Sequence, residues 1–110
     1  MITMKPDELL LLNLITSVNK ARNFYLEAIH AAKTADYEIC NELMRKGNEM
    51  YADGHRIHQK LIQLEADGEK HEFSVLLTHA QDQLISAECF KILCDEFISV
   101  YKRLDNLKEN

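Results

Sequence analysis

Almost nothing in this chain interrupts a helix. Its 110 residues include three glycines and one proline, and that proline, Pro6, stands near the start, where a helix tolerates it. Apolar residues recur at steps of three and four through most of the sequence, which is the period of an amphipathic helix. The pattern predicts an all-α protein, and the length predicts one domain spanning residues 1–110.

The first two helices are predicted from their capping residues. The first begins at Glu8 with Asp7 as its cap, and the second begins after Asp36, whose carboxylate can cap it. Two glycines, Gly47 and Gly54, fall inside the second helix and weaken it. Each therefore marks a place where a neighbouring helix is expected to approach closely.

The segment "ADGEKHEF" separates the second helix from the third, because it combines an Asp-Gly turn signal with charged residues. The third helix begins near Phe73 or Ser74 and continues to about Leu107. Helices of roughly 27 to 34 residues are rods of about 40 to 50 Å. Short connections between such rods force an antiparallel up-down-up bundle of three helices.

The third helix has two apolar seams. The first consists of Leu77, Ala80, Leu84, Ala87, Cys94 and Tyr101. The second, at heptad spacing, consists of Val75, Thr78, Asp82, Ile85, Cys89 and Ile92. One seam is enough for a three-helix bundle, so the second predicts a partner surface, and the simplest partner is another copy of the same helix around a symmetry axis. We therefore predict a homotrimer, or a larger homo-oligomer, assembled through the third helix.

A polar stripe interrupts the apolar segment "SVLLTHAQDQLISAE". Its members are His79, Asp82, Gln83 and Ser86, which are spaced so that they are neighbours on the helix. A carboxylate such as Asp82 in a dry interface is costly unless it is paired or bound to a cation. If three copies of Asp82 meet on an axis, a divalent cation with oxygen ligands, such as Mg²⁺, would relieve their repulsion. A protonated Asp82, or one rotated to solvent, is the alternative.

His79 lies near the rim of that seam, where a ring nitrogen can reach a partner protein. A neutral imidazole is a nucleophile toward phosphorus, carbon or a metal. No second histidine or carboxylate completes a zinc site beside it, and no serine nucleophile has a matching base. Covalent use of the imidazole is the interpretation that remains.

Charge and cysteine content narrow the class of protein. The formal net charge is -5, and lysines and arginines form no basic stripe, which argues against a nucleic-acid binder. Three cysteines, Cys40, Cys89 and Cys94, lack C-x-x-C spacing, and an odd number fits a reducing compartment, so we expect three small buried hydrophobic side chains. No apolar stretch reaches the roughly 18 residues of a membrane span, and we expect a cytoplasmic protein.

The other histidines are expected to have no chemical role. His55 and His58 are three residues apart on the second helix, but no third and fourth ligand accompanies them, as a zinc site requires. His30 is expected at an exposed helical position, and His71 in a loop.

The segment "THAQDQLISAE" resembles the motif around the phosphorylated histidine of the lactose and cellobiose class of enzyme IIA. Enzyme IIA proteins of this class are components of the bacterial phosphoenolpyruvate-dependent sugar phosphotransferase system. The matching residues are His79, Ala80, Gln81, Asp82 and Leu84, with Ile85 as a conservative change. The segments "ARNFYLEAIHAAKTADYE" and "GHRIHQKLI" resemble the family's first helix with its turn and its second helix, so the resemblance covers nearly the whole chain.

The resemblance implies a phosphotransferase component that acts through a covalent phosphohistidine. His79 would take a phosphoryl group from the small histidine phosphocarrier HPr and pass it to a cysteine of enzyme IIB. The pathway would serve uptake of a cellobiose, chitobiose or lactose-type sugar through the membrane component, enzyme IIC. The family also implies a homotrimer in which Asp82 of each chain binds a metal ion on the axis.

Gln81 and Gln83 are the candidate hydrogen-bond donors to the phosphoryl oxygens. Gln83 stands where the family usually has a second histidine, and an amide can donate a hydrogen bond but cannot carry a positive charge. The rival hypothesis is a non-enzymatic oligomerisation or adaptor module, in which the polar stripe only fixes the register of the helices.

Overall fold

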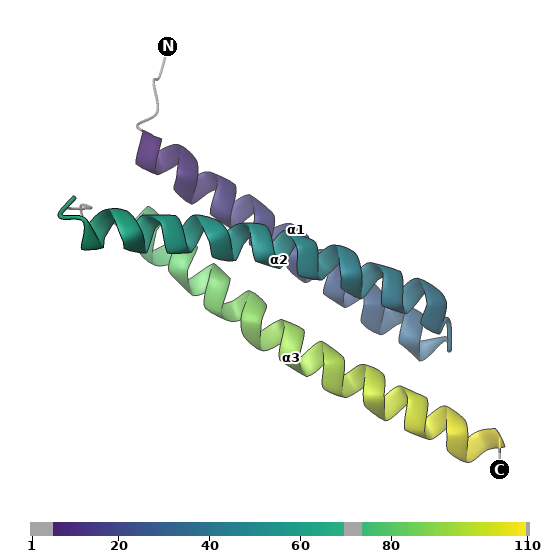
Figure 1. Cartoon of the computed structure of the whole chain (residues 1–110). Coiled ribbons are helices and arrows are strands. Elements are labelled where there is room, and N and C mark those ends of the chain that lie inside the picture. Colours follow the sequence, from purple (N-terminus) through teal and green to yellow (C-terminus); the bar gives the residue numbers. More distant parts are fainter. Residues whose placement is uncertain (1–5, 70–73, 110) are drawn as a thin grey trace.

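The computed structural model of this chain describes residues 6–69 and 74–109, and these ranges contain three helices and no strand. Helix α1 comprises Pro6–Lys33, α2 comprises Tyr37–Ala66 and α3 comprises Val75–Glu109. Helices α1 and α3 run in the same direction, and α2 runs against both (Figure 1). The predicted all-α, up-down-up bundle is confirmed. Across the described ranges, none of the helices is long and apolar enough to cross a membrane.

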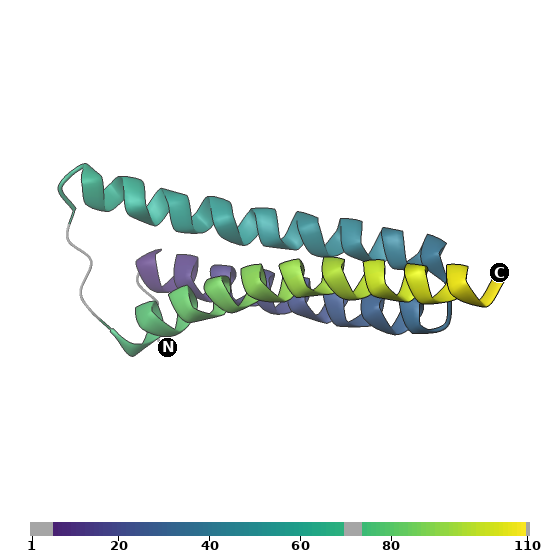
Figure 2. The same cartoon turned by 90° about the horizontal axis from the view of Figure 1, so that it is seen from below.

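Helix α1 is the centre of the bundle. It packs against α2 and against α3, whereas α2 and α3 touch each other at few places. In the view of Figure 2, the first part of α1 lies between the end of α2 and the start of α3. The molecule is elongated, with extents of 60 × 31 × 19 Å. The orientation of α3 is therefore set mainly by its contacts with α1.

One apolar face of each helix forms the core. From α1 the buried residues are Leu11, Leu14, Val18, Ala21, Tyr25, Ala28 and Ala32. From α2 and α3 they are Cys40, Met44, Leu61, Ala80, Leu84, Ala87, Cys94 and Ile98. The first apolar seam of α3 is thus the one that faces α1, and its two end members, Leu77 and Tyr101, are half-buried. Because most of these residues repeat at steps of three and four, a single stripe of each helix is buried away from water.

The two glycines predicted at close approaches do lie there. A Cβ atom on Gly47 would come within 2.5 Å of the ring of Tyr25, and one on Gly54 within 2.8 Å of a methyl group of Val18. Any side chain at either position would collide with α1. The absence of a Cβ atom lets α1 and α2 pack at this distance.

Both predicted caps of the first two helices need correction. Helix α1 begins at Pro6, so Asp7 lies inside its first turn instead of preceding it. Asp36 does occupy the N-cap position of α2, but its side chain makes no capping hydrogen bond. The backbone N–H of Asp36 donates to the carbonyl oxygen of Ala31 at 2.9 Å, and Ala35 has a positive φ of 60°. A tight backbone turn therefore connects α1 to α2.

The start of α3 is close to the prediction. Ser74 precedes the helix, and its Oγ accepts a hydrogen bond from the backbone N–H of Leu77 at 3.0 Å, so Ser74 caps α3. Phe73, the other predicted start, lies outside the described residues. At the far end of α3, the Tyr37 hydroxyl donates a hydrogen bond to the carboxylate of Asp105, which joins the start of α2 to the last turns of α3.

Candidate functional site

Helix α3 carries four polar side chains on one flank. His79 and Asp82 are exposed, and Gln83 and Ser86 are half-buried. Since each residue turns the helix by about 100°, these four positions fall within about 100° of one another. Gln83 is about 40° from His79, and Ser86 about 20° from it. The imidazole of His79 is therefore open to solvent, with an amide and a hydroxyl on the same flank.

Gln81 lies on a different flank of α3. It is exposed, but it follows His79 by two residues, so the two side chains point about 200° apart around the helix. Within one chain, Gln83 is placed to donate a hydrogen bond to a group on His79. Gln81 is not.

Apart from half-buried Thr78, the second apolar seam of α3 is exposed in the single chain. Val75 is 85% exposed, Ile85 59% and Ile92 56%. The sequence prediction takes this seam only as far as Ile92. Exposed apolar residues continue at steps of three and four almost to the end of the helix, and this spacing is visible in the sequence. We name the whole series the outer row: Val75, Thr78, Asp82, Ile85, Cys89, Ile92, Leu93, Phe97, Val100, Leu104 and Leu107.

Cys89 belongs to the outer row and is exposed, so the prediction that all three cysteines are buried is wrong for this one. Cys40 and Cys94 are buried between the helices. Burial raises the pKa of the Cys94 thiol to about 11, with smaller contributions from Asp95 and Cys40, and burial also raises the pKa of Cys40. The thiol of Cys89 is the accessible one.

One chain does not hold a complete set of metal ligands in its described part. No group of three or more His, Cys, Asp or Glu side chains is placed there to bind a metal ion. Asp82 stands in the outer row among apolar residues and offers carboxylate oxygens, which hard divalent cations prefer. A metal ion at Asp82 would need ligands from further copies of the chain.

Helix α1 contributes an arginine to the flank of His79 that sequence reasoning missed. Nη1 of Arg22 donates to Oγ of Ser86 at 3.4 Å, and Nη2 donates to Oδ1 of Asn19 at 2.5 Å. Ser86 lies seven residues after His79, on the same side of α3. No local sequence pattern could have indicated this contact, because it depends on how α1 docks against α3.

The other histidines form no metal group within the described residues. The ring of His55 stacks on that of Tyr51 with centroids 6.1 Å apart. His58 is half-buried, and loss of solvation lowers its pKa, with a smaller effect from the charge of His55. His30 is exposed on α1, as predicted, and His71 lies outside the described residues.

Comparison with known proteins supports the resemblance seen in the sequence. The family model for the "PTS system, Lactose/Cellobiose specific IIA subunit" matches residues 9–102. The lactose-specific EIIA component of Staphylococcus epidermidis is 32% identical over 102 residues, which cover 91% of this chain and 98% of that protein. The lichenan-specific phosphotransferase enzyme IIA component of Bacillus subtilis is 34% identical over 97 residues, which cover 88% of each.

The fold is likewise shared with a solved relative. The crystal structure of the cellobiose-specific enzyme IIA from Bacillus anthracis superposes with a TM-score of 0.91 at 41% sequence identity. The match covers 94% of this chain and 95% of that one. Sequence, length and fold thus agree over almost the whole molecule, and the chain belongs to the lactose/cellobiose-specific IIA family of the phosphotransferase system.

Proposed function

We propose that this chain is a cytoplasmic phosphoryl carrier that becomes phosphorylated on His79. It accepts the phosphoryl group from HPr and passes it to a cysteine of enzyme IIB, which serves sugar uptake through enzyme IIC. The observation that carries the proposal is the exposed imidazole of His79 within the sequence "HAQDQL" on α3. Its family membership supports the same assignment.

The transfer is two displacements at phosphorus. In the first, a neutral ring nitrogen of His79 forms a bond to phosphorus while the bond from phosphorus to the histidine nitrogen of HPr breaks. In the second, the thiolate of enzyme IIB forms a sulfur–phosphorus bond while the bond to His79 breaks, which restores the neutral imidazole. The protein contributes mainly in-line positioning and hydrogen-bond donors to the phosphoryl oxygens.

Gln83 is the donor that the same chain can supply, because it is four residues from His79 and on the same flank. Its amide N–H can bond a phosphoryl oxygen on His79 without adding a charge. Gln81 points to the other flank of α3, so its role depends on assembly.

We propose further that three copies assemble through the outer row of α3. The outer row is a long exposed apolar stripe, and water is removed from it when copies of α3 pack together. In such a coiled arrangement Asp82 occupies a core position, and His79 and Gln81 occupy its two flanking positions. Flanking positions of adjacent helices face each other. Gln81 of one subunit would then lie beside His79 of its neighbour, so the phosphoryl site would be complete only in the assembly.

In this assembly the three Asp82 carboxylates would hold a divalent cation, with Mg²⁺ the natural candidate for oxygen ligands. The cation would neutralise the carboxylates at the axis. The phosphoryl transfer at His79 requires no bond to this cation.

Phosphorylation of the intact protein tests the main proposal. Incubation with phosphoenolpyruvate, enzyme I and HPr should add one acid-labile phosphate, measured by intact mass. His79→Ala should remain unlabelled, while His30→Ala, a second exposed histidine, should be labelled like the wild type. Addition of cognate enzyme IIB should discharge the label onto its cysteine. An unlabelled wild-type protein, or equal labelling of His79→Ala, would refute the proposal.

The same experiment separates the carrier from a non-enzymatic oligomerisation or adaptor module. The length of the outer row is the observation that favours the second function, since it continues far beyond His79. A pure oligomerisation module would assemble through that row but take up no phosphate. The sugar is not specified by this chain, and cellobiose, chitobiose and lactose-type sugars all fit the proposal.

A further inference from the structure

Arg22 carries a positive charge that no described carboxylate neutralises. Its guanidinium is half-buried and donates hydrogen bonds to the amide oxygen of Asn19 and the hydroxyl of Ser86, which are both neutral. By contrast, Arg45 forms ion pairs with Glu42 and Glu49, and Arg56 forms one with Asp53. Removing a cation from water without an acidic partner costs free energy, and in this respect Arg22 differs from the two exposed, ion-paired arginines of α2.

The unneutralised charge faces the same side of α3 as His79. Ser86, which the guanidinium contacts, follows His79 by seven residues, which is about 20° short of two full turns. The distance along the helix axis is about 10 Å. Arg22 in this position does not touch a group on His79, but its field reaches the space in front of the imidazole.

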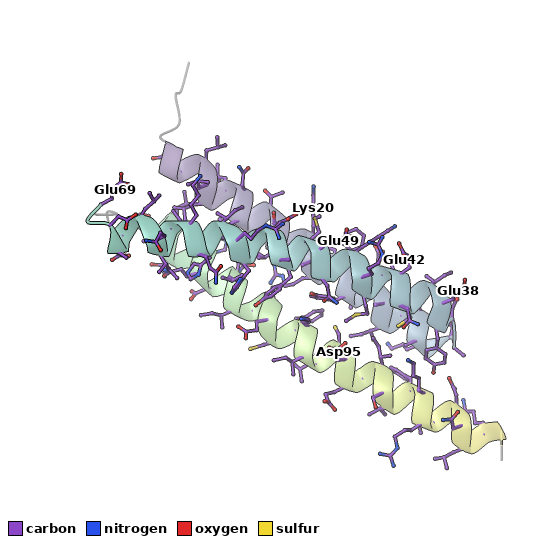
Figure 3. The ribbon with its side chains drawn as sticks, in the orientation of Figure 1. Lys20, Glu38, Glu42, Glu49, Glu69 and Asp95 are labelled. Atoms are coloured by element: carbon purple, nitrogen blue, oxygen red, sulfur yellow. The ribbon has the colours of Figure 1, made fainter. Side chains whose placement is uncertain are left out.

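The rest of the molecule is unfavourable for an incoming phosphoryl group. The chain has a formal net charge of -5, and acidic side chains such as Glu38, Glu42 and Glu49 are spread along α2 (Figure 3). A phosphoryl group brings roughly two more negative charges at neutral pH. The phosphoryl group is therefore repelled by the average field of this chain, and a local positive potential near the acceptor would favour its approach to His79.

We propose that Arg22 is an electrostatic guide for the phosphorylated donor. It acts through its charge, placed by Asn19 and Ser86 on the flank of His79, and it forms no bond in the transfer. This inference rests on the proposed function, because it assumes that a phosphorylated protein approaches His79. It assigns to α1 a part in a reaction whose nucleophile lies on α3.

Loss of the Arg22 charge should weaken the approach of the phosphorylated donor, and it should leave the phosphoryl transfer step unchanged. Arg22→Gln keeps a polar amide at this position but removes the charge. We expect the KM for phosphorylated HPr to rise by about three- to tenfold at low salt, with kcat within about twofold of the wild type. The difference in KM should shrink at high salt, where charges separated by about 10 Å are screened.

Matched variants separate this role from a structural one. Arg22→Lys keeps the charge and loses the planar hydrogen-bonding group, so it should retain most of the wild-type KM and its salt dependence. Lys20→Gln removes one positive charge from the same helix, at a position in the groove between α1 and α2 (Figure 3). This variant should leave the KM and its salt dependence unchanged. Helix content and melting temperature of each variant report whether the fold is intact.

Three results would overturn the inference. Arg22→Gln could match the wild type in KM and salt dependence, Arg22→Lys could lose as much as Arg22→Gln, or Lys20→Gln could raise KM equally. The first excludes a role for the charge, the second assigns the effect to geometry, and the third assigns it to overall net charge. Each differs from failure of the proposed function, in which wild-type protein takes up no phosphate at all.

Discussion

The ring of Tyr25 occupies the space that a side chain at Gly47 would need. A Cβ atom on Gly47 would lie 2.5 Å from Cε1 of Tyr25. Tyr25 is fully buried, and its hydroxyl donates a hydrogen bond to Oδ1 of Asn48 at 2.8 Å. The contact fixes how closely α1 and α2 approach in the half of the bundle that contains their connecting turn.

Gly47→Ala should therefore destabilise the fold although alanine favours helices. Overpacking costs about 1–3 kcal/mol, and the better helix propensity returns about 1 kcal/mol. We expect a lower free energy of unfolding in urea, by up to about 2 kcal/mol. Lys60→Ala, at an exposed position of the same helix, should change it by less than about 0.5 kcal/mol. An unchanged or raised stability of Gly47→Ala would show that the Tyr25 ring can move aside.

Assembly through the outer row can be tested by placing a charge in it. Three copies of Ile92→Lys would bring unpaired cations together in an apolar contact, which is strongly unfavourable. In sedimentation velocity the wild type should behave as three chains of 12.8 kDa, and Ile92→Lys as one. Asn41→Lys introduces the same side chain at an exposed position of α2 that lines the groove between α2 and α3, and it should still sediment as a trimer. A monomeric wild type would exclude this assembly.

Asp82→Leu should preserve or strengthen the trimer, because it replaces repelling carboxylates on the axis with apolar contacts. The wild-type trimer should weaken when EDTA removes divalent cations, and the Asp82→Leu trimer should not respond. Dissociation on dilution, followed by sedimentation with and without EDTA, measures both effects. Asp95→Leu makes the same exchange at a residue of α3 that lines the groove between α2 and α3 (Figure 3 labels Asp95), and it should keep the wild-type response to EDTA. A trimer that falls apart on Asp82→Leu would mean that the metal contributes more than the repulsion costs.

Cys89 lies in the outer row, so its thiol can report whether copies of α3 pack around the proposed trimer axis. In the native protein one thiol, that of Cys89, should react quickly with a labelling reagent, while buried Cys40 and Cys94 react only in denaturant. Mild oxidation should link two Cys89 residues of neighbouring subunits, since only two of three thiols at an axis can pair. Denaturing electrophoresis should show a dimer and a remaining monomer, and Cys89→Ser should abolish the dimer. A dimer that persists in Cys89→Ser would contradict the arrangement.

His58 should make stability depend on pH. Its pKa is lowered in the folded protein, mainly by lost solvation, while the unfolded chain titrates near the ordinary value of about 6.5. The unfolded state therefore binds more protons just below that pH, and stability should fall as pH drops through this range until the folded-state pKa is passed. His58→Gln should flatten this slope in urea unfolding measured at several pH values, and His30→Gln should retain it. Parallel slopes for wild type and His58→Gln would exclude His58 as the source.

Much of this protein follows from its sequence by itself. The period of the apolar residues and the scarcity of helix breakers determine the helices, because hydrogen bonds within a helix are local and its buried face repeats every three or four residues. The same period in α3 indicates two apolar seams, and the sequence around His79 points to the family. Gly47 and Gly54 predict close approaches between helices, because glycine in a helix interior is otherwise costly.

What the sequence left open was decided by how the helices dock. The central place of α1, the contact of Arg22 with Ser86 and the difference between exposed Cys89 and buried Cys94 depend on the rotation and height of one helix against another. That arrangement results from the sum of many weak contacts across the core, such as the fit of Tyr25 over Gly47. Residues distant in the chain contribute to it together, so no local pattern encodes it.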